Sequence, residues 1–202
     1  METIALKMSR DRRFLRHVEL LKFLMTTKTH VPTSKIAQEI GCSIPTVIKE
    51  VKYLNEQLKT THAKIKTSAT GLIYFSHDKS VCFNSLILQL HRQTLAFKIM
   101  DALLKNKNWR MEVAMRELKA SRTLLSTTIT HMNKVLKNYH IYINSATLRF
   151  IGREENIRLA LFHYYSFFGD YSLIDEYGEN EASGLAELFN HYGMKPLHVS
   201  HY

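Results

Sequence analysis

The clearest hydrophobic pattern in the chain lies between Thr33 and Leu58 and predicts two helices joined by a tight turn. In the second helix, Val47, Val51, Leu54 and Leu58 follow one another at spacings of four, three and four residues. This spacing places all of these side chains on one face of a helix. The second helix is therefore expected to have one buried stripe and one exposed face.

The polar residues around this pattern predict where the helices begin and end. Ser34 can cap the first helix, and Gly41 stands where that helix must stop with a positive φ. Ser43 can cap the second helix, and Pro45 lies in its first turn, where a helix tolerates proline. This order is typical of a helix-turn-helix. An ordinary helical hairpin in a bundle would share the pattern.

The flanking segments predict the rest of a winged-helix domain. A helix with one apolar face is expected from about Ser9 to Thr27, after a lead-in, Met1–Met8, without regular structure. Two β-like runs, Ala63–Ser68 and Leu72–Ser76, surround Gly71 and its neighbours and predict a β-hairpin. Helix, helix-turn-helix and hairpin is the order of a winged helix, with the hairpin as the wing.

The same pattern recurs when the chain is shifted by 78 residues, which indicates an internal repeat. Ser43 falls on Ser121 and Asn55 falls on Asn133. The buried stripe recurs as Leu125, Ile129, Met132 and Leu136. The second turn, Lys119-Ala120-Ser121, lacks the glycine of the first copy, so we expect it to be made differently.

The second copy also has a leading helix and a wing. The helix is expected from Ser85 to about Lys105, and the strands are expected at Ile141–Ile143 and Leu148–Ile151. After the wing, a helix should run from about Glu154 to Phe168, and another from Glu181 to Tyr192.

The predicted fold is therefore mainly α with small β-hairpin wings, and it consists of tandem winged helix-turn-helix domains followed by a short helical segment. The first domain is expected at residues 9–80 and the second at residues 81–152. Residues 153–202 form an acidic, aromatic-rich helical segment, the expected start of a regulatory or dimerisation domain.

Charge is distributed unevenly along the chain. Residues 1–80 hold 14 Lys/Arg and 7 Asp/Glu, and residues 81–152 hold 11 and 3. Residues 153–202 hold 3 Lys/Arg and 8 Asp/Glu. A polyanionic partner therefore belongs to the first 152 residues, where the net charge is +15.

The candidate DNA contacts lie on the outward faces of the two predicted recognition helices and on the first wing. The first helix offers Ile44, Thr46, Lys49, Lys52 and Tyr53 outward. The full candidate set is Ser43, Thr46, Lys49, Lys52, Lys64, Lys66, Arg122, Thr123, Ser126, Thr127, Thr130 and Lys134. Only Arg122 suits bidentate contact with guanine, so we expect modest base readout and much reliance on phosphates and DNA shape. A solvated helix face would explain the Ser and Thr residues equally well.

No motif of catalysis, metal binding or cofactor binding is present in the sequence. There is no P-loop, no G-x-S-x-G and no His/Cys set at zinc spacing. The two cysteines, Cys42 and Cys82, form no C-x-x-C pair and no disulfide framework. We expect neither an enzyme nor a small-molecule ligand, cofactor or metal.

The sequence also bears on location. The N-terminus lacks the apolar run of a secretory signal, and the longest apolar stretch, around Leu159–Phe168, is too short to span a bilayer. We expect a cytoplasmic, nucleoid-associated bacterial protein with no membrane contact.

With these residues in view, the chain resembles the Mga/AtxA class of virulence regulators over roughly residues 10–168. The resemblance rests on the run Ser43–Asn55, on the second helix-turn-helix before Leu136, and on the junction Phe150–Arg158. It implies a Gram-positive bacterial transcription factor with two N-terminal winged helices. It further implies paired regulatory domains phosphorylated on histidine, and a C-terminal oligomerisation domain.

The chain departs from that pattern at its end. Only the opening helices of a first regulatory domain would fit before Tyr202, so we expect a fragment or a short relative. His163, His191, His198 and His201 lie there, but none sits in a matching motif, and we assign no phosphorylation site.

Taken together, these patterns favour a DNA-binding transcriptional regulator that binds double-stranded DNA as a homodimer. Two alternatives share the fold: a protein-binding tandem winged-helix scaffold of a chromosome-organising complex, and a plasmid replication initiator. The positive charge of the first 152 residues favours a DNA binder over a scaffold.

Overall fold

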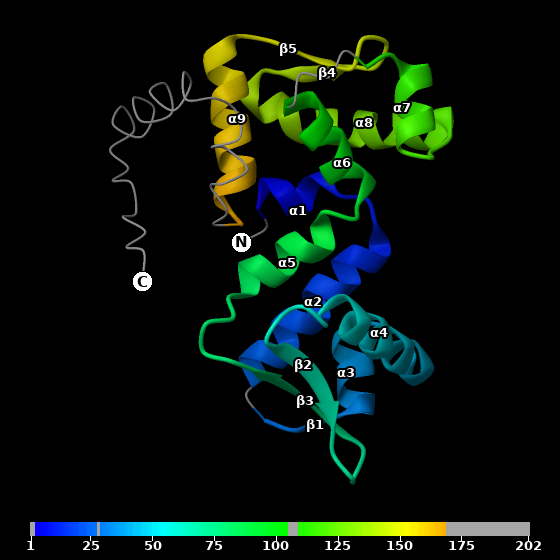
Figure 1. Ribbon diagram of the computed structural model, residues 1–202, viewed down its shortest axis with the longest axis vertical. Helices are drawn as coiled ribbons and strands as arrows, with labels where there is room; N and C mark the ends of the chain where they lie inside the picture. Colours follow the sequence, from blue (N-terminus) through cyan, green and yellow to red (C-terminus); the bar gives the residue numbers. More distant parts are fainter. Residues whose placement is uncertain (1–2, 28, 105–108, 169–202) are drawn as a thin grey trace.

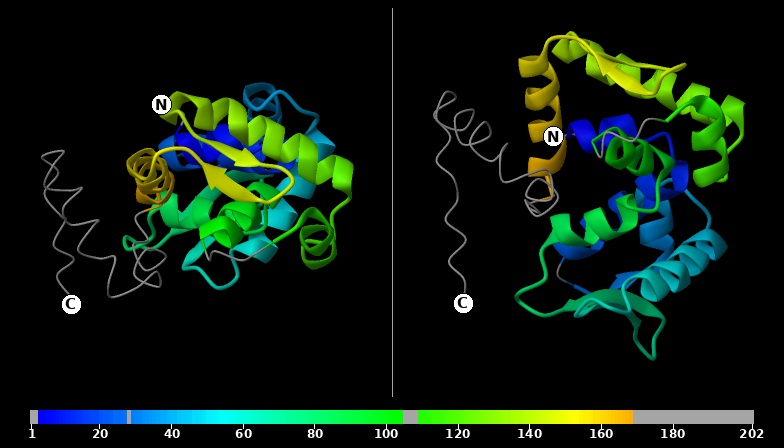
Figure 2. Two further views of the ribbon diagram at one scale, coloured as in Figure 1. Left: turned by 90° about the horizontal axis from the view of Figure 1, so that it is seen from above. Right: turned by 45° about the horizontal axis from the view of Figure 1, so that its top comes forward.

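The computed structural model describes residues 3–27, 29–104 and 109–168, and it is mainly helical (Figure 1). Two groups of helices, each with a small antiparallel sheet, are stacked along the long axis of the molecule (Figures 1 and 2). We call them the first unit and the second unit. None of the helices in these ranges is both long enough and apolar enough to cross a membrane.

The first unit has the predicted order of a winged helix. It consists of α2 (Arg12–Thr27), β1 (Val31–Pro32), α3 (Thr33–Glu39), α4 (Ile44–Gln57), β2 (Ala63–Thr67) and β3 (Leu72–His77). The sheet order is β1-β3-β2, with Val31 opposite Ile73 and Ile65 opposite Phe75. The hairpin is confirmed, whereas β1 is a third strand that was not predicted, because two residues are too few to show an alternating pattern.

The second unit repeats this plan with a smaller sheet. It consists of α6 (Leu95–Leu104), α7 (Met111–Glu117), α8 (Arg122–Leu136), η1 (Lys137–Tyr139), β4 (Tyr142–Asn144) and β5 (Arg149–Ile151). The helix α9 (Glu154–Ser166) follows and confirms the helix expected there. The helix expected at residues 181–192 lies outside the described residues.

The side chains of both predicted stripes are buried, which confirms the periodicity as the signal of the core. They are Val47, Val51, Leu54, Leu58, Leu125, Ile129, Met132 and Leu136.

The leading helix predicted from Ser85 to about Lys105 is wrong, because the chain breaks into α5 (Phe83–His91) and α6. The hydroxyl of Thr94 accepts a hydrogen bond from the backbone N–H of Phe97 at 3.2 Å, which caps the first turn of α6. The periodicity of the apolar residues continues across the break, so it hides the cap.

The prediction of no regular structure before residue 9 is also wrong. Residues Ile4–Met8 form α1, which packs against α8 and α9 of the second unit rather than against the adjoining first unit (Figure 1). Ile4, Ala5 and Met8 are buried there. The ring Nε2 of His131 on α8 lies 2.8 Å from the carbonyl oxygen of Lys7.

The two units meet at α5, where His91 is completely buried. Its ring stacks on Phe14 of α2, with centroids 4.9 Å apart, and on Phe168 beyond α9, with centroids 5.5 Å apart. Its Nε2 lies 2.7 Å from the hydroxyl of Tyr164. Burial lowers the pKa of His91 to about 3, so this side chain is neutral at physiological pH. One continuous apolar core therefore runs through both units.

Candidate nucleic-acid interface

The turn between the two helices is built in the same way in both units. Gly41 has φ of 63° and Lys119 has φ of 49°, both in the left-handed region. The N–H of Cys42 donates to the carbonyl of Ala37 at 2.9 Å, and the N–H of Ala120 donates to that of Met115 at 3.1 Å. The expectation of a different second turn is wrong, because the hydrogen bonds of the turn hold a lysine in a conformation that favours glycine.

A serine caps each recognition helix, as predicted from the sequence. The Oγ of Ser43 accepts from the backbone N–H of Thr46 at 3.3 Å, and the Oγ of Ser121 accepts from that of Leu124 at 3.2 Å. The predicted cap at Ser34 is wrong, since α3 begins one residue earlier, after Pro32, without a side-chain cap.

An asparagine joins each recognition helix to the free edge of its hairpin. Asn55 Nδ2 donates to the carbonyl of Ile65 at 2.8 Å, and the N–H of Ile65 donates to Asn55 Oδ1 at 2.8 Å. Asn133 makes the same pair of bonds with Ile143, at 2.9 and 2.7 Å. These bonds pair backbone groups of a strand edge and fix the hairpin against the helix. The repeat revealed both asparagines, but their role was visible only in the structure.

On α4, the exposed strip includes Ile44, Ile48, Lys49 and Lys52, and Pro45 and Glu56 are exposed beside them. Ile48 was not among the residues expected to point outward, although it is 58% exposed. Its position four residues after Ile44 is the signal that could have found it.

Two other residues expected on this outward face lie at its flank instead. Tyr53 is half-buried, stacked on His17 with centroids 5.0 Å apart, and Arg13 lies over its ring at 3.8 Å. Thr46 is half-buried, and its hydroxyl lies 2.8 Å from that of Ser43. The outward placement of Tyr53 was wrong because α2 covers this side of α4.

Behind this flank, α2 and α4 share a buried carboxylate, Glu50. It accepts hydrogen bonds from Arg13 Nε at 2.9 Å and Arg16 at 3.0 Å, and it lies 2.8 Å from His17 Nε2. Burial would raise the pKa of Glu50, but the bonds from His17 and Arg13 outweigh it, and the pKa is lowered. Arg13 and Arg16 of α2 therefore have a structural partner in Glu50.

The exposed strip of α8 differs in chemistry from that of α4. Arg122 is exposed and pairs with Glu112 of α7 at 2.5 Å. The hydroxyls of Thr127 and Thr130 donate to backbone carbonyls one turn back, at 2.9 Å in both cases. Thr123 and Lys134 are exposed, and Ser126 is half-buried. The structure thus brings the predicted residues of α8 onto one strip, with Arg122 already engaged.

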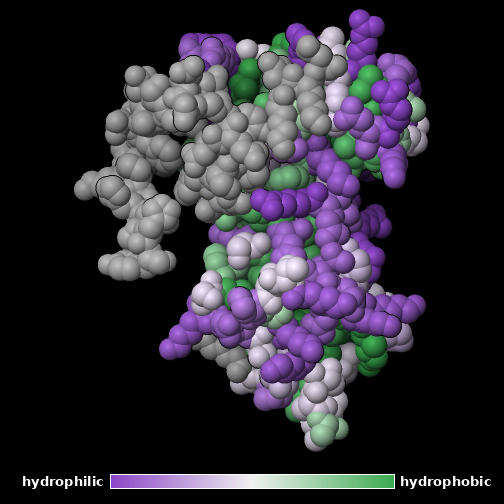
Figure 3. All heavy atoms as spheres, in the orientation of Figure 1, coloured by the Kyte–Doolittle hydropathy of each residue, from purple (hydrophilic) through white to green (hydrophobic). Residues whose placement is uncertain are grey.

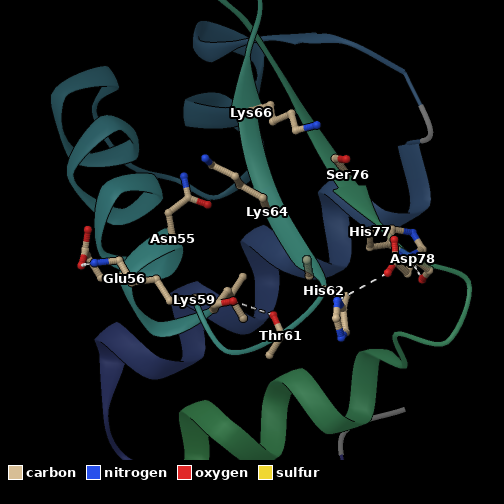
Figure 4. A pocket seen from close by; sticks show the side chains of 12 residues that line it. Asn55, Glu56, Lys59, Thr61, His62, Lys64, Lys66, Ser76, His77 and Asp78 are labelled. Atoms are coloured by element: carbon tan, nitrogen blue, oxygen red, sulfur yellow. Dashed lines mark hydrogen bonds and ion pairs between the residues drawn. The ribbon is translucent and has the colours of Figure 1, made fainter.

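The first wing carries its two candidate lysines on the face of β2 that points away from the core (Figure 4). Lys64 and Lys66 line an open pocket of about 440 Å³ between β2 and the C-terminal end of α4. The carboxylates that line it have basic neighbours, Glu56 with Lys59 and Asp78 with His62. Lys64 and Lys66 form no ion pair with another described residue, so their charge is available to an outside anion.

Residues near the N-terminus also contact the recognition helix of the second unit. A guanidinium nitrogen of Arg10 lies 3.5 Å from the carbonyl oxygen of Thr127. Together with α1, this contact covers the side of α8 that corresponds to the α2-covered side of α4. Within the described ranges, no group of three or more His, Cys, Asp or Glu side chains could hold a metal ion.

Comparison with protein families assigns both units. Residues 16–71 match a family model described as an HTH domain, and residues 79–165 match one described as an Mga helix-turn-helix domain. The resemblance to Mga-type regulators is thereby confirmed, and the Mga match reaches from α5 through most of α9. No curated protein matched the sequence.

The two matches agree with the geometry described above. The first runs from within α2 to the tip of the first hairpin, and the Mga match covers the second unit with α5 and most of α9. Two helix-turn-helix domains in tandem support a DNA-binding transcription regulator. These domain types also indicate a regulatory rather than an enzymatic role.

Proposed function

We propose that the chain is an Mga-type transcriptional regulator that contacts duplex DNA through α4, α8 and the first wing, with most of the affinity from phosphates and DNA shape. The observation that carries this proposal is the set of cations around the first recognition helix. Lys49, Lys52, Lys64 and Lys66 are all exposed, and none forms an ion pair within the described part of the chain. Uncompensated exposed lysines of this kind neutralise phosphates and release counterions on binding.

The chemistry of α8 supports modest base readout. The guanidinium of Arg122 must leave Glu112 before it can contact guanine with both nitrogens. The hydroxyl hydrogens of Thr127 and Thr130 are used within the helix, which leaves their oxygens as acceptors. We therefore assign α8 mainly to positioning the protein on the DNA.

The proposed protein works as a homodimer in a bacterial cytoplasm, on the nucleoid. Helix-turn-helix regulators commonly bind two related half-sites as dimers, so that the symmetry of the operator follows that of the protein. Light scattering of the purified chain, alone and with duplex DNA, tests the dimer independently of DNA affinity.

The test of DNA binding is fluorescence anisotropy of the purified chain with labelled promoter and random-sequence duplexes over a salt series. Affinity should fall steeply with salt, and the variant Lys49→Ala/Lys52→Ala should bind more weakly, with a slope smaller by about 2. Lys98→Ala, which removes an exposed lysine from α6, is the matched control and should leave the slope unchanged.

Each outcome has a definite meaning. Tighter binding to the promoter indicates a sequence- or shape-selective regulator, and equal binding indicates a backbone reader. Absence of binding at moderate salt would contradict the proposal and favour the protein-binding scaffold. An unchanged slope in the double variant would remove α4 from the interface.

A further inference from the structure

The exposed strip of α4 contains two large aliphatic side chains. Ile44 is 44% exposed and Ile48 is 58% exposed. They are four residues apart, so they lie next to each other on successive turns of the helix. Figure 3 shows a hydrophobic area among hydrophilic residues at the right-hand edge of the lower half, where Figure 1 places α3 and α4.

These isoleucines have no place in the core of the protein. They stand at the exposed margin of the buried stripe, since Val51 follows Ile48 by three residues on the same side of α4. The flank that carries Glu50 and Tyr53 is covered by α2. The exposed parts of Ile44 and Ile48 are therefore open to a partner from outside the first unit.

The charge around the two isoleucines indicates the chemistry of that partner. Lys49 and Lys52 lie on the same exposed strip. The carboxylates of α4 do not offset them, because Glu50 is buried and bound, and Glu56 pairs with Lys59. An apolar strip with a positive rim fits an apolar group that is surrounded by negative charge.

The major groove of DNA contains such a group, the C5-methyl of thymine, between two phosphate backbones. We propose that Ile44 and Ile48 pack against thymine methyl groups and so select thymine in the half of the target read by α4. The inference rests on the proposed DNA binding and adds a base preference to it. The second unit has Arg122 and Ser126 at the corresponding positions of α8, and its exposed aliphatic side chain, Leu124, stands at a different position of the helix.

The size of the effect follows from the area of one methyl group. Burying a methyl group contributes about 0.8 kcal/mol, which corresponds to roughly a 4-fold change in affinity for each thymine in contact. This is smaller than a bidentate hydrogen bond but large enough to measure with duplexes that differ only in methyl groups.

The experiment compares thymine with deoxyuridine, which has the same hydrogen-bonding edge without the methyl group. A tight-binding duplex is first selected from a random-sequence library with the wild-type chain. It is then synthesised with thymine and, one position at a time, with deoxyuridine. Binding is measured for the wild type, Ile44→Ala, Ile48→Ala and Ile151→Ala. The last is the matched control, because Ile151 is an exposed isoleucine at the end of β5.

The expected result is a roughly 4-fold loss in wild-type affinity at one or two thymine positions. Ile48→Ala or Ile44→Ala should weaken binding to the thymine duplex by a similar factor and bring its thymine-to-deoxyuridine ratio close to one. Ile151→Ala should keep the wild-type ratio. Both α4 variants keep the helix, since alanine has a higher helix propensity than isoleucine.

Two results would overturn the inference while leaving DNA binding intact. One is equal wild-type affinity for the thymine and deoxyuridine duplexes at every position. The other is a wild-type ratio in both α4 variants, which would assign the methyl contact to another residue. If the selection returns no bound duplex, the proposed function itself fails, and α4 becomes a candidate surface for a protein partner.

Discussion

The two helix-turn-helix units have the same internal supports and different exposed strips. The serine cap, the left-handed turn residue, the buried stripe and the asparagine on the hairpin edge recur at a constant shift of 78 residues. The exposed strips do not follow the repeat, because Ile44 and Ile48 correspond to Arg122 and Ser126. One backbone plan therefore carries two surfaces with different chemistry.

The units also differ in how the flank of the recognition helix is covered. In the first unit, α2 covers α4 through the ion pairs of Glu50, whereas Thr128 stands at the corresponding position of α8. In the second unit, the distant N-terminal helix α1 packs beside α8. The flank of the first recognition helix is thus covered by a neighbour in sequence, whereas α8 packs against the distant α1 as well as against its neighbours α6 and α7.

The strongest test of this difference is Met8→Ala. Met8 is fully buried, and its truncation should cost about 2–5 kcal/mol. Because α1 packs on the second unit, amide hydrogen exchange should accelerate in α8 and α9 before α4. Met25→Ala, a half-buried methionine of α2, is the control and should affect the first unit. Equal acceleration in both units would show that they open together.

Replacing the two asparagines tests whether the same pair of hydrogen bonds contributes equally to the free energy of unfolding in both units. Replacing Asn55 or Asn133 by Ala leaves a backbone N–H and a carbonyl without partners, at a cost of about 2–3 kcal/mol. We expect Asn133→Ala to be the more costly, because β4 and β5 form a two-stranded sheet of short strands. Urea denaturation measures both values, and a larger cost at Asn55 would contradict this order.

Acid should destabilise the folded chain through His91, at the junction between the two units. His91 has a pKa of about 3 in the folded chain and about 6.5 when unfolded, so below pH 6.5 the unfolded chain takes up the proton first. Stability should fall by about 1.4 kcal/mol per pH unit below that point from this residue alone. His91→Gln keeps a hydrogen-bonding group near Tyr164 and should flatten the slope of unfolding free energy against pH. An unchanged slope would exclude His91 as its source.

Glu50→Gln tests the support that only the first unit has. It should cost about 1–2 kcal/mol, since Arg13 and Arg16 are partly exposed and solvent screens their charges. The pKa of Glu50 is lowered in the fold, so its stabilisation is present above pH 4.5 and is lost as pH falls through the folded value. Denaturation at neutral and acidic pH should therefore show a difference between wild type and variant that shrinks in acid.

The smallest effects belong to the turns. Gly41→Ala should cost about 1 kcal/mol from backbone conformation alone, because an added Cβ meets no atom within 4 Å. Lys119→Gly should stabilise by about 0.5 kcal/mol or less, since relief of the left-handed lysine is partly offset by a more flexible unfolded chain. Thermal unfolding measures both, and a destabilised Lys119→Gly would show that the lysine side chain contributes to the turn.

The sequence was sufficient to predict the elements whose signals are local. The caps at Ser43 and Ser121, both buried stripes and both hairpins follow from residue types at fixed spacings, and the repeat strengthened each of them. Two of the predictions that failed depend on distant contacts. Nothing near Met8 indicates that it will be buried against α8, and nothing near Tyr53 indicates that α2 will cover it.

The sequence also predicted the exposure of most, but not all, of the candidate site residues. The lysines of α4 and the wing are exposed as expected, but Arg122 carries an ion pair and Ile48 was missed. An exposed isoleucine reads as a core residue in any pattern that counts apolar positions. Only the packing seen in the structure distinguishes such an isoleucine from the buried residues of the stripe.

The crossing of α1 to the second unit constrains how the protein is made. As the chain leaves the ribosome, α1 emerges before the other described elements, but its docking surface on α8 and α9 is completed only about 160 residues later. At translation speeds of 5–20 residues per second, Ile4, Ala5 and Met8 stay without their partners for roughly 10–30 seconds. The first unit can fold in that time, whereas the Mga domain must wait for its own last helix before the N-terminus can dock. The contact between α1 and the second unit therefore closes only after α9 has been made.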